Sequence, residues 1–155
     1  MAKEIEHKFL VRSDDWKATS TEGKIYRQAY MASNPTVRIR IVDETTGILT
    51  LKTKIVGITR EEFEYEVPLE DAQVMMASFT SGEIVEKRRH LCVVGGKTWE
   101  IDVFSGSNEG LIVAELELQS EDEPFELPEW VGECVTGDSR YSNSSLSQNP
   151  FCSWE

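Results

Sequence analysis

Charged and apolar side chains alternate along eight segments of this 155-residue chain. Because successive side chains of a β-strand point to opposite faces of a sheet, this alternation predicts strands with one charged and one apolar face. The segments are residues 3–11, 24–31, 36–43, 47–55, 59–67, 83–94, 97–104 and 110–119. Turn residues such as Asn34-Pro35, Val56-Gly57 and Gly95-Gly96 separate several of them, which predicts that most strands pair with the next one as hairpins.

The charges on these faces are sorted by sign. The cations are Lys8, Arg38, Arg40, Lys52, Lys54, Lys87 and Arg89, and the carboxylates are Glu4, Glu6, Glu62, Glu64, Glu100, Asp102, Glu115 and Glu117. On a single strand, charged alternation usually marks a solvated outer face. A solubilising face would mix the two signs along each strand, because opposite charges pair favourably across neighbouring strands. The two sets also nearly cancel, in a chain whose net charge is −12. We therefore expect the sheet to close with its charged face inward.

Three segments depart from the alternation. Residues 68–80 place Met76 and Phe79 at helical spacing, and residues 138–148 predict a second short helix. Residues 123–137 are expected to be irregular, because two prolines interrupt them. The helices are thus expected to be few and short.

The expected fold is mainly β (α+β): an eight-stranded antiparallel β-barrel, or tunnel, with a charged lumen and a few short helices, in one domain over residues 1–155. Its outward face would be apolar, and the residues expected there include Ile39, Leu51, Ile101 and Leu116. Apolar residues need a cover, so we expect the two helices, or a second copy of the chain in a homodimer, to shield them.

Composition excludes several classes of function. A net charge of −12 repels nucleic acid and anionic membranes. No apolar run approaches the roughly 20 residues that cross a bilayer, and the first residues do not resemble a signal peptide, so we expect a cytoplasmic protein. The cysteines, Cys92, Cys134 and Cys152, lack the spacing of a disulfide framework or a thiolate zinc site. His7 and His90 share no visible constellation with a nucleophile, which argues against a hydrolytic triad.

The two halves of the charged face call for two kinds of ligand. Guanidinium and ammonium groups from several strands would bind an anion that bears many oxygens, which means phosphate. Carboxylates opposite them suit Mg²⁺ or Mn²⁺, hard cations that take oxygen ligands and bridge to phosphates. A small polyphosphate with a divalent metal ion satisfies both halves.

The same residues resemble the CYTH family, also called triphosphate tunnel metalloenzymes, over nearly the whole chain. The family's E-x-E-x-K motif stands here as Glu4-Ile5-Glu6-His7-Lys8. Further matching motifs follow in the family's order: Gln28-Ala29-Tyr30, Arg38 with Arg40, Thr50-Leu51-Lys52, Arg60-Glu61-Glu62-Phe63-Glu64, Glu86-Lys87-Arg88-Arg89, Glu100-Ile101-Asp102-Val103-Phe104, Ala114-Glu115-Leu116-Glu117, and residues 135–143.

The resemblance implies roles for the charged residues. The implied metal ligands are Glu4, Glu6, Glu115 and Glu117, followed by Asp102, Glu62 and Glu64. The implied phosphate-binding residues are Lys8, Arg38, Arg40, Lys52, Lys87 and Arg89. Lys8, Lys52, Tyr30 and Arg140 are the candidates for a direct part in catalysis. Lys54 fits the charged face, but the motif ends at Lys52.

The implied activity is metal-dependent hydrolysis of a short linear polyphosphate, above all inorganic tripolyphosphate, to pyrophosphate and phosphate. The alternatives are a class IV-type adenylate cyclase, a nucleoside or thiamine triphosphatase, and a non-catalytic polyphosphate-binding module. Phe63, Tyr65 and Trp99 alternate with the charges and the turns are short, so the sequence predicts no pocket for a base at the tunnel mouth. Tripolyphosphate is therefore expected to be a better substrate than ATP.

Overall fold

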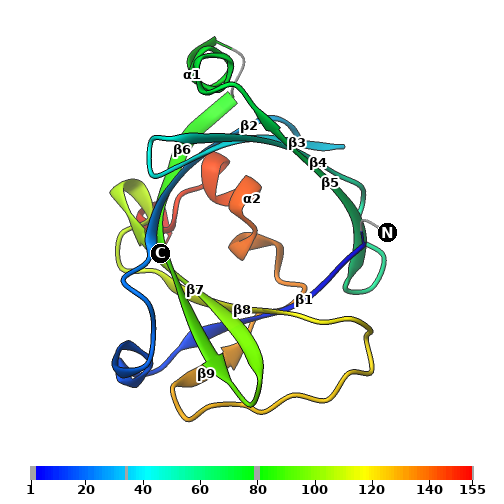
Figure 1. Cartoon of the computed structure of the whole chain (residues 1–155), viewed down its shortest axis with the longest axis vertical. Coiled ribbons are helices and arrows are strands. Elements are labelled where there is room, and N and C mark those ends of the chain that lie inside the picture. The colour runs from blue at the N-terminus through cyan, green and yellow to red at the C-terminus, as the bar shows by residue number, and fades with distance from the viewer. Residues whose placement is uncertain (1–2, 34, 79–80, 155) are drawn as a thin grey trace.

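A computed structural model of the chain describes residues 3–33, 35–78 and 81–154, which form nine β-strands in one antiparallel sheet (Figure 1). The strands are β1 (Lys3–Val11), β2 (Lys24–Ser33), β3 (Thr36–Val42), β4 (Thr46–Lys52), β5 (Thr59–Val67), β6 (Ser81–Val94), β7 (Lys97–Ser105), β8 (Ile112–Glu117) and β9 (Val131–Cys134). The helices are α1 (Leu69–Ser78) and α2 (Asn143–Gln148), with short 3₁₀ turns at Asp15–Ala18, Gly106–Asn108, Ser139–Tyr141 and Phe151–Ser153.

The sheet closes on itself through β1. The strand order is β5-β4-β3-β2-β6-β7-β8-β1-β9, and β1 pairs with β5 as well as with β8. Glu4 lies opposite Arg60 of β5, and Glu6 lies opposite Glu117 of β8. Strands β1 to β8 therefore form the predicted eight-stranded antiparallel barrel, and β9 is an extra strand beside β1.

Helix α1 covers one outer face of the barrel. Ala72 and Met76 of this helix pack with Ile39 and Ile41 of β3. The helix approaches the sheet most closely at Gly47 of β4, where an added Cβ would lie only 2.6 Å from the Ala72 Cβ. A residue without a side chain is thus required where α1 crosses β4.

A second outer core is covered by β9 and the chain before it, together with the 3₁₀ turn Asp15–Ala18. Ile101 and Leu116, together with Trp99, form a buried cluster with Trp130 and with Phe125. Burial of these apolar side chains is the main favourable term that holds the 119–130 segment on the barrel.

The prediction that the outward residues need a cover is confirmed for Ile39, Ile101 and Leu116, which are buried. The prediction that both helices provide that cover is wrong. Leu51 remains 36% exposed on the outer face.

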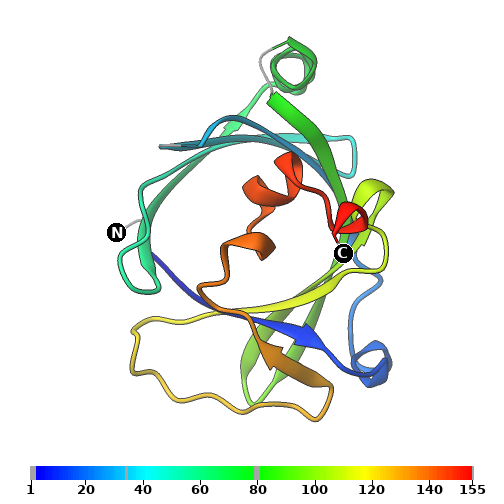
Figure 2. The ribbon, with the colours of Figure 1, turned by 180° about the vertical axis from the view of Figure 1, so that it is seen from behind.

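Helix α2 lies inside the barrel, where it fills part of the lumen (Figures 1 and 2). Its Leu146 is fully buried and packs with Val85, Phe104 and Val113, residues of the inner face of β6, β7 and β8. The Ser142 hydroxyl caps the helix by accepting a hydrogen bond from the Ser145 N–H at 3.2 Å. The inner face of the barrel is therefore charged over one part and apolar over the part that α2 covers.

The other differences from prediction are local. The predicted helix 138–148 is a 3₁₀ turn followed by α2, and the predicted irregular segment contains β9. Strand β9 forms because it pairs with β1, a tertiary contact that local pattern does not report. The end of the predicted helix 68–80, with Phe79, lies outside the described residues. Among the described residues, no helix is long and apolar enough to span a bilayer.

Candidate functional site

A cavity of about 130 Å³ lies in the charged part of the lumen. The residues predicted for a site that line it are Glu4, Glu6, Lys8, Tyr30, Arg38, Arg40, Lys52, Glu62, Glu64, Arg89, Glu115 and Glu117, and Glu100 lines it too. These side chains come from all eight strands of the barrel, so the site is assembled by the fold as a whole and not by any single element. These charged side chains point into the barrel, as the alternation predicts.

Three predicted site residues do not line this cavity. Lys87 and Asp102 are fully buried behind its wall, where Lys87 Nζ and Asp102 Oδ2 are 2.7 Å apart. Arg140 is exposed, with its guanidinium on Asp138 at 2.8 Å and over the rings of Tyr141 and Trp154. These contacts hold Arg140 on the surface, so its expected part in catalysis has no support in this geometry.

Glu4 is held by two cations from neighbouring strands. Lys52 Nζ lies 3.0 Å from one carboxylate oxygen of Glu4, and Arg60 Nε lies 3.0 Å from the other. Burial would raise the pKa of Glu4, but Lys52 and Arg60 lower it to about 2. Lys52 also pairs with Glu62 at 3.2 Å. The Glu4 carboxylate is therefore ionised and already neutralised by the protein.

Arg60 is a lining residue that the sequence interpretation did not single out. It sits at an even-numbered position of β5, on the same face as Glu62 and Glu64, so the alternation contained the signal. Arg60 belongs to the matching motif of residues 60–64, but as a cation among carboxylates it interrupts the sorting of charges by sign and was given no role.

Among the described cations that line the cavity, Arg40 is the one whose charge the protein neutralises least. Its Nε donates to Gln28 Oε1 at 2.7 Å, and its guanidinium lies 4.8 Å from the Tyr26 ring centroid. In the described part of the chain, Arg40 takes part in no ion pair. Burial lowers the pKa of Arg40 to about 9, and the nearby Arg38 and Arg89 contribute. An anion in the cavity would relieve this repulsion.

The other two arginines are partly engaged. Arg38 NH2 donates to Thr50 Oγ1 at 3.0 Å and to Glu64 Oε2 at 3.2 Å, whereas Arg38 Nε is buried without a partner among the described residues. Arg89 binds Asp102 through two nitrogens, Nε at 2.8 Å and NH2 at 2.9 Å. Asp102 thus fixes the plane of the Arg89 guanidinium at the cavity wall.

Burial would raise the pKa of Asp102, but Arg89 and Lys87 hold it well below its usual range. With both oxygens engaged by these cations, Asp102 is not available as a metal ligand. Its side chain is also fully buried. Asp102 therefore holds the side chains of Lys87 and Arg89 in position.

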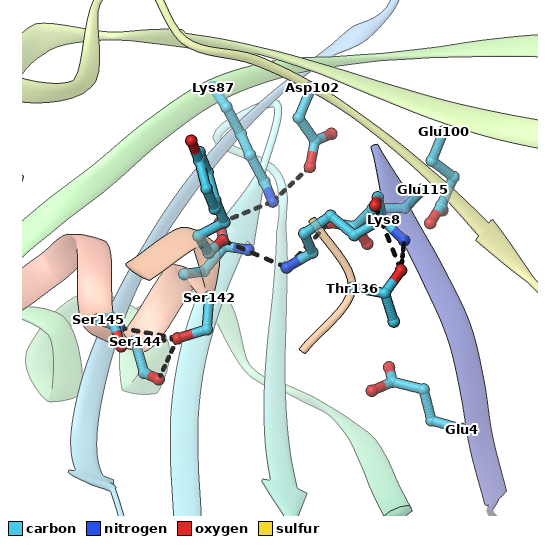
Figure 3. A network of polar contacts seen from close by, with 12 residues as sticks. Glu4, Lys8, Lys87, Glu100, Asp102, Glu115, Thr136, Ser142, Ser144 and Ser145 are labelled. Carbon is cyan, nitrogen blue, oxygen red and sulfur yellow. Dashed lines mark hydrogen bonds and ion pairs between the residues drawn. The ribbon is translucent and has the colours of Figure 1, made fainter. Parts of the chain in front are cut away.

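The start of α2 forms part of the cavity wall, which the sequence interpretation missed. Ser142, Asn143 and Ser144 line the cavity. Lys8 Nζ donates to the Tyr141 carbonyl at 3.2 Å, and Lys87 Nζ donates to Asn143 Oδ1 at 3.0 Å (Figure 3). Since strand cations hold it by two contacts, this segment has a fixed place in the lumen.

A second cavity, of about 440 Å³, adjoins the first and shares Lys8 and Arg60 with it. We call it the entrance cavity. The 53–58 segment, with Lys54 and Ile58, lines one side and residues 135–139 line another. The short turns of the sequence did not predict this cavity, to which the 53–58 loop contributes one wall. Phe63 does lie on the outer face, as predicted, and is 40% exposed.

A family model of the CYTH domain matches residues 2–148. The chain belongs to the CYTH domain family. An inorganic triphosphatase from Acetivibrio thermocellus is 42% identical over 153 residues, which cover 97% of each chain. An inorganic triphosphatase from Nitrosomonas europaea is 34% identical over 153 residues, covering 93% of this chain and 96% of the relative. The crystal structure of the inorganic triphosphatase NE1496 superposes with a TM-score of 0.67 at 32% identity, over 95% of each chain.

Membership in the CYTH family implies dependence on a divalent metal ion, and the carboxylates of β1 and β8 fit such an ion. Glu6 lies directly opposite Glu117 in the strand pair, and Glu115 is 3.8 Å from Lys8. Burial raises the pKa of Glu6 well above its usual value, and Glu115 and Glu4 add to the rise. Burial and neighbouring carboxylates also raise the pKa of Glu117. A cation between these oxygens would offset the repulsion.

Among the described residues, no group of three or more His, Cys, Asp and Glu side chains is placed to hold a metal ion by itself. A divalent ion such as Mg²⁺ is commonly held by one or two carboxylates, with water and substrate phosphate as the remaining ligands. Glu6 and Glu117, which lie opposite each other on β1 and β8, are the carboxylates that would hold it.

Proposed function

We propose that this protein hydrolyses inorganic tripolyphosphate to pyrophosphate and phosphate, with Mg²⁺ or Mn²⁺ as its metal ion. The observation that carries the proposal is the buried Arg40 guanidinium. It has no carboxylate partner among the described residues, and it lines a cavity that Arg38 and Arg89 also line. Phosphate oxygens are the ligands that such a cluster favours. The two relatives named inorganic triphosphatases support the same substrate.

In this proposal the arginines bind and orient the polyphosphate. Lys52 and Lys8, which line the same cavity, stabilise the charge that grows on the pyrophosphate leaving group. A bound metal ion would neutralise phosphate charge and lower the pKa of the attacking water. The water oxygen attacks the terminal phosphorus, the P–O bond to the pyrophosphate breaks, and the proton of the water is released to solvent.

The direct test measures the products formed from tripolyphosphate by ion chromatography, with Mg²⁺ and with Mn²⁺. We expect phosphate and pyrophosphate in equal amounts. Arg40→Ala should lower kcat/KM by about a hundredfold or more, whereas Arg27→Ala, which removes a surface arginine of β2 paired with Glu86, should not change it. Wild-type protein that binds tripolyphosphate without turnover would instead be a polyphosphate-binding module.

The entrance cavity favours a second candidate function, hydrolysis of an organic triphosphate. Ile55, Ile58 and Val135 give this cavity an apolar lining, which would suit the organic group of an ester such as ATP or thiamine triphosphate. A comparison of kcat/KM for these compounds and tripolyphosphate separates the two candidates. Cyclic AMP among the products, detected by mass spectrometry, would identify the protein as a cyclase.

A further inference from the structure

Lys87 lies behind the cavity wall, and it contacts a side chain that lines the cavity without lining the cavity itself. Its side chain has no exposed surface, and it does not line the cavity. Its ammonium donates to Asp102 Oδ2 at 2.7 Å and to Asn143 Oδ1 at 3.0 Å. Of these two partners, only Asn143 lines the cavity.

The contact with Lys87 fixes which way the Asn143 amide faces. A lysine ammonium has only donors, so the amide group that meets it must be the oxygen and not the nitrogen. The Nδ2 group is then the remaining polar group of this side chain. Among the described residues, nothing accepts a hydrogen bond from it. Asn143 thus presents an unused, neutral donor on a residue that lines the cavity.

The segment that carries Asn143 is firmly held. Lys8 Nζ donates to the carbonyl of Tyr141, two residues earlier, at 3.2 Å. Leu146, three residues later, is fully buried against the inner face of the barrel. A donor held on both sides in this way loses little freedom when it binds a ligand, which favours affinity.

We propose that Asn143 Nδ2 donates a hydrogen bond to a phosphate oxygen of the substrate, and that Lys87 is a positioning residue that sets the amide for this contact. The proposal rests on the proposed function for the identity of the substrate. It assigns Asn143 a binding role that no charged motif in the sequence indicates. In this proposal Lys87 does not contact the phosphate itself but acts on it by orienting the Asn143 amide.

The test compares two substitutions at the same position. Asn143→Asp keeps an oxygen for Lys87 but replaces the donor with a carboxylate, whereas Asn143→Ala removes both groups. We expect both variants to raise KM for tripolyphosphate by about tenfold or more, with a smaller effect on kcat, because a hydrogen bond to a charged ligand is lost. The Asp variant should keep the wild-type Tm, since its contact with Lys87 remains.

Asn149→Asp is the matched control. Asn149 follows the other end of α2, is exposed, and lines neither cavity, so the same chemical change there should leave KM unaltered. Wild-type KM in Asn143→Asp would overturn the proposal and reduce Asn143 to an anchor for α2. If wild-type protein does not turn over tripolyphosphate, the proposed function fails. The affinities of the same proteins for tripolyphosphate with Mg²⁺, measured by calorimetry, then test the inference separately.

The indirect role of Lys87 has its own readout. If Lys87 acts through Asn143, Lys87→Met and Asn143→Ala should each raise KM, and the double variant should be little worse than the more severe single one. If the rise in KM of the double variant equals the product of the two single rises, Lys87 contacts the substrate independently of Asn143, and this part of the proposal is overturned.

Discussion

Lys52 Nζ on β4 and Glu4 Oε2 on β1 lie 3.0 Å apart, although 48 residues separate them in the chain. Both side chains are nearly buried, and Arg60 binds the second oxygen of the same carboxylate. The contact joins β4 to β1 next to the place where β5 and β1 close the barrel. One carboxylate therefore supports both the closure of the fold and the position of a lumen lysine.

This contact predicts how stability depends on pH. The pKa of Glu4 falls from 4.5 to about 2 on folding, so its contribution to stability is complete above about pH 5 and is lost as the pH falls through 2. Arg60→Gln removes part of it. Urea denaturation in chelator should show the variant roughly 1–2 kcal/mol less stable at pH 7, with the difference shrinking as the pH falls from about 5 through 2. A difference that does not change with pH would mean that Arg60 acts by packing alone.

Lys52→Met should lower kcat for tripolyphosphate by about a hundredfold or more, because the substitution removes a cation from the cavity and leaves Glu4 and Glu62 facing the substrate. The chain should remain folded, as circular dichroism would verify, because Arg60 still binds Glu4. Lys17→Met, at an exposed position outside the lumen lining where the lysine forms an ion pair with Asp14, is the control and should keep the wild-type rate. A fully active Lys52→Met enzyme would remove Lys52 from the site.

Metal dependence is expected to reside in the β1–β8 carboxylates. Chelator should abolish phosphate release, and Ca²⁺ should inhibit because its larger, looser coordination shell misplaces the water. Glu117→Gln should weaken Mn²⁺ binding, measured by calorimetry, by about tenfold or more, since Glu6 loses the charged partner opposite it. Glu133→Gln on β9, which does not line the cavity, serves as the control. Equal Mn²⁺ affinity in all three proteins would place the metal elsewhere.

The alternation predicted the barrel and the direction of its charges, because a period of two fixes which side chains share a face. It could not predict which charges pair. Lys87 and Arg89 occupy equivalent positions on β6, yet one is buried behind Asp102 and the other lines the cavity. That difference depends on the place of α2. A six-residue helix has too little periodicity to indicate that it packs inside a barrel.

One sequence signal for α2 did exist. Val85 has the same parity as Lys87, and Phe104 has the same parity as Asp102, so both strands change from charged to apolar on their inner faces. An apolar inner face needs an apolar partner inside the barrel, and Leu146 of α2 is that partner. The charged motifs lie toward one end of each strand, and the apolar positions that face α2 lie toward the other.

The inner apolar cluster should therefore control the site through α2. Leu146→Ala leaves a cavity among Val85, Phe104 and Val113 and should lower the free energy of unfolding by about 2–5 kcal/mol. Because α2 then docks less firmly, KM for tripolyphosphate should rise by severalfold although Leu146 does not line the cavity. Met76→Ala, a comparable deletion under α1 on the outer face, should cost similar stability without changing KM. Equal KM in the two variants would mean that the position of α2 does not affect the lumen, and that the strands alone determine substrate affinity.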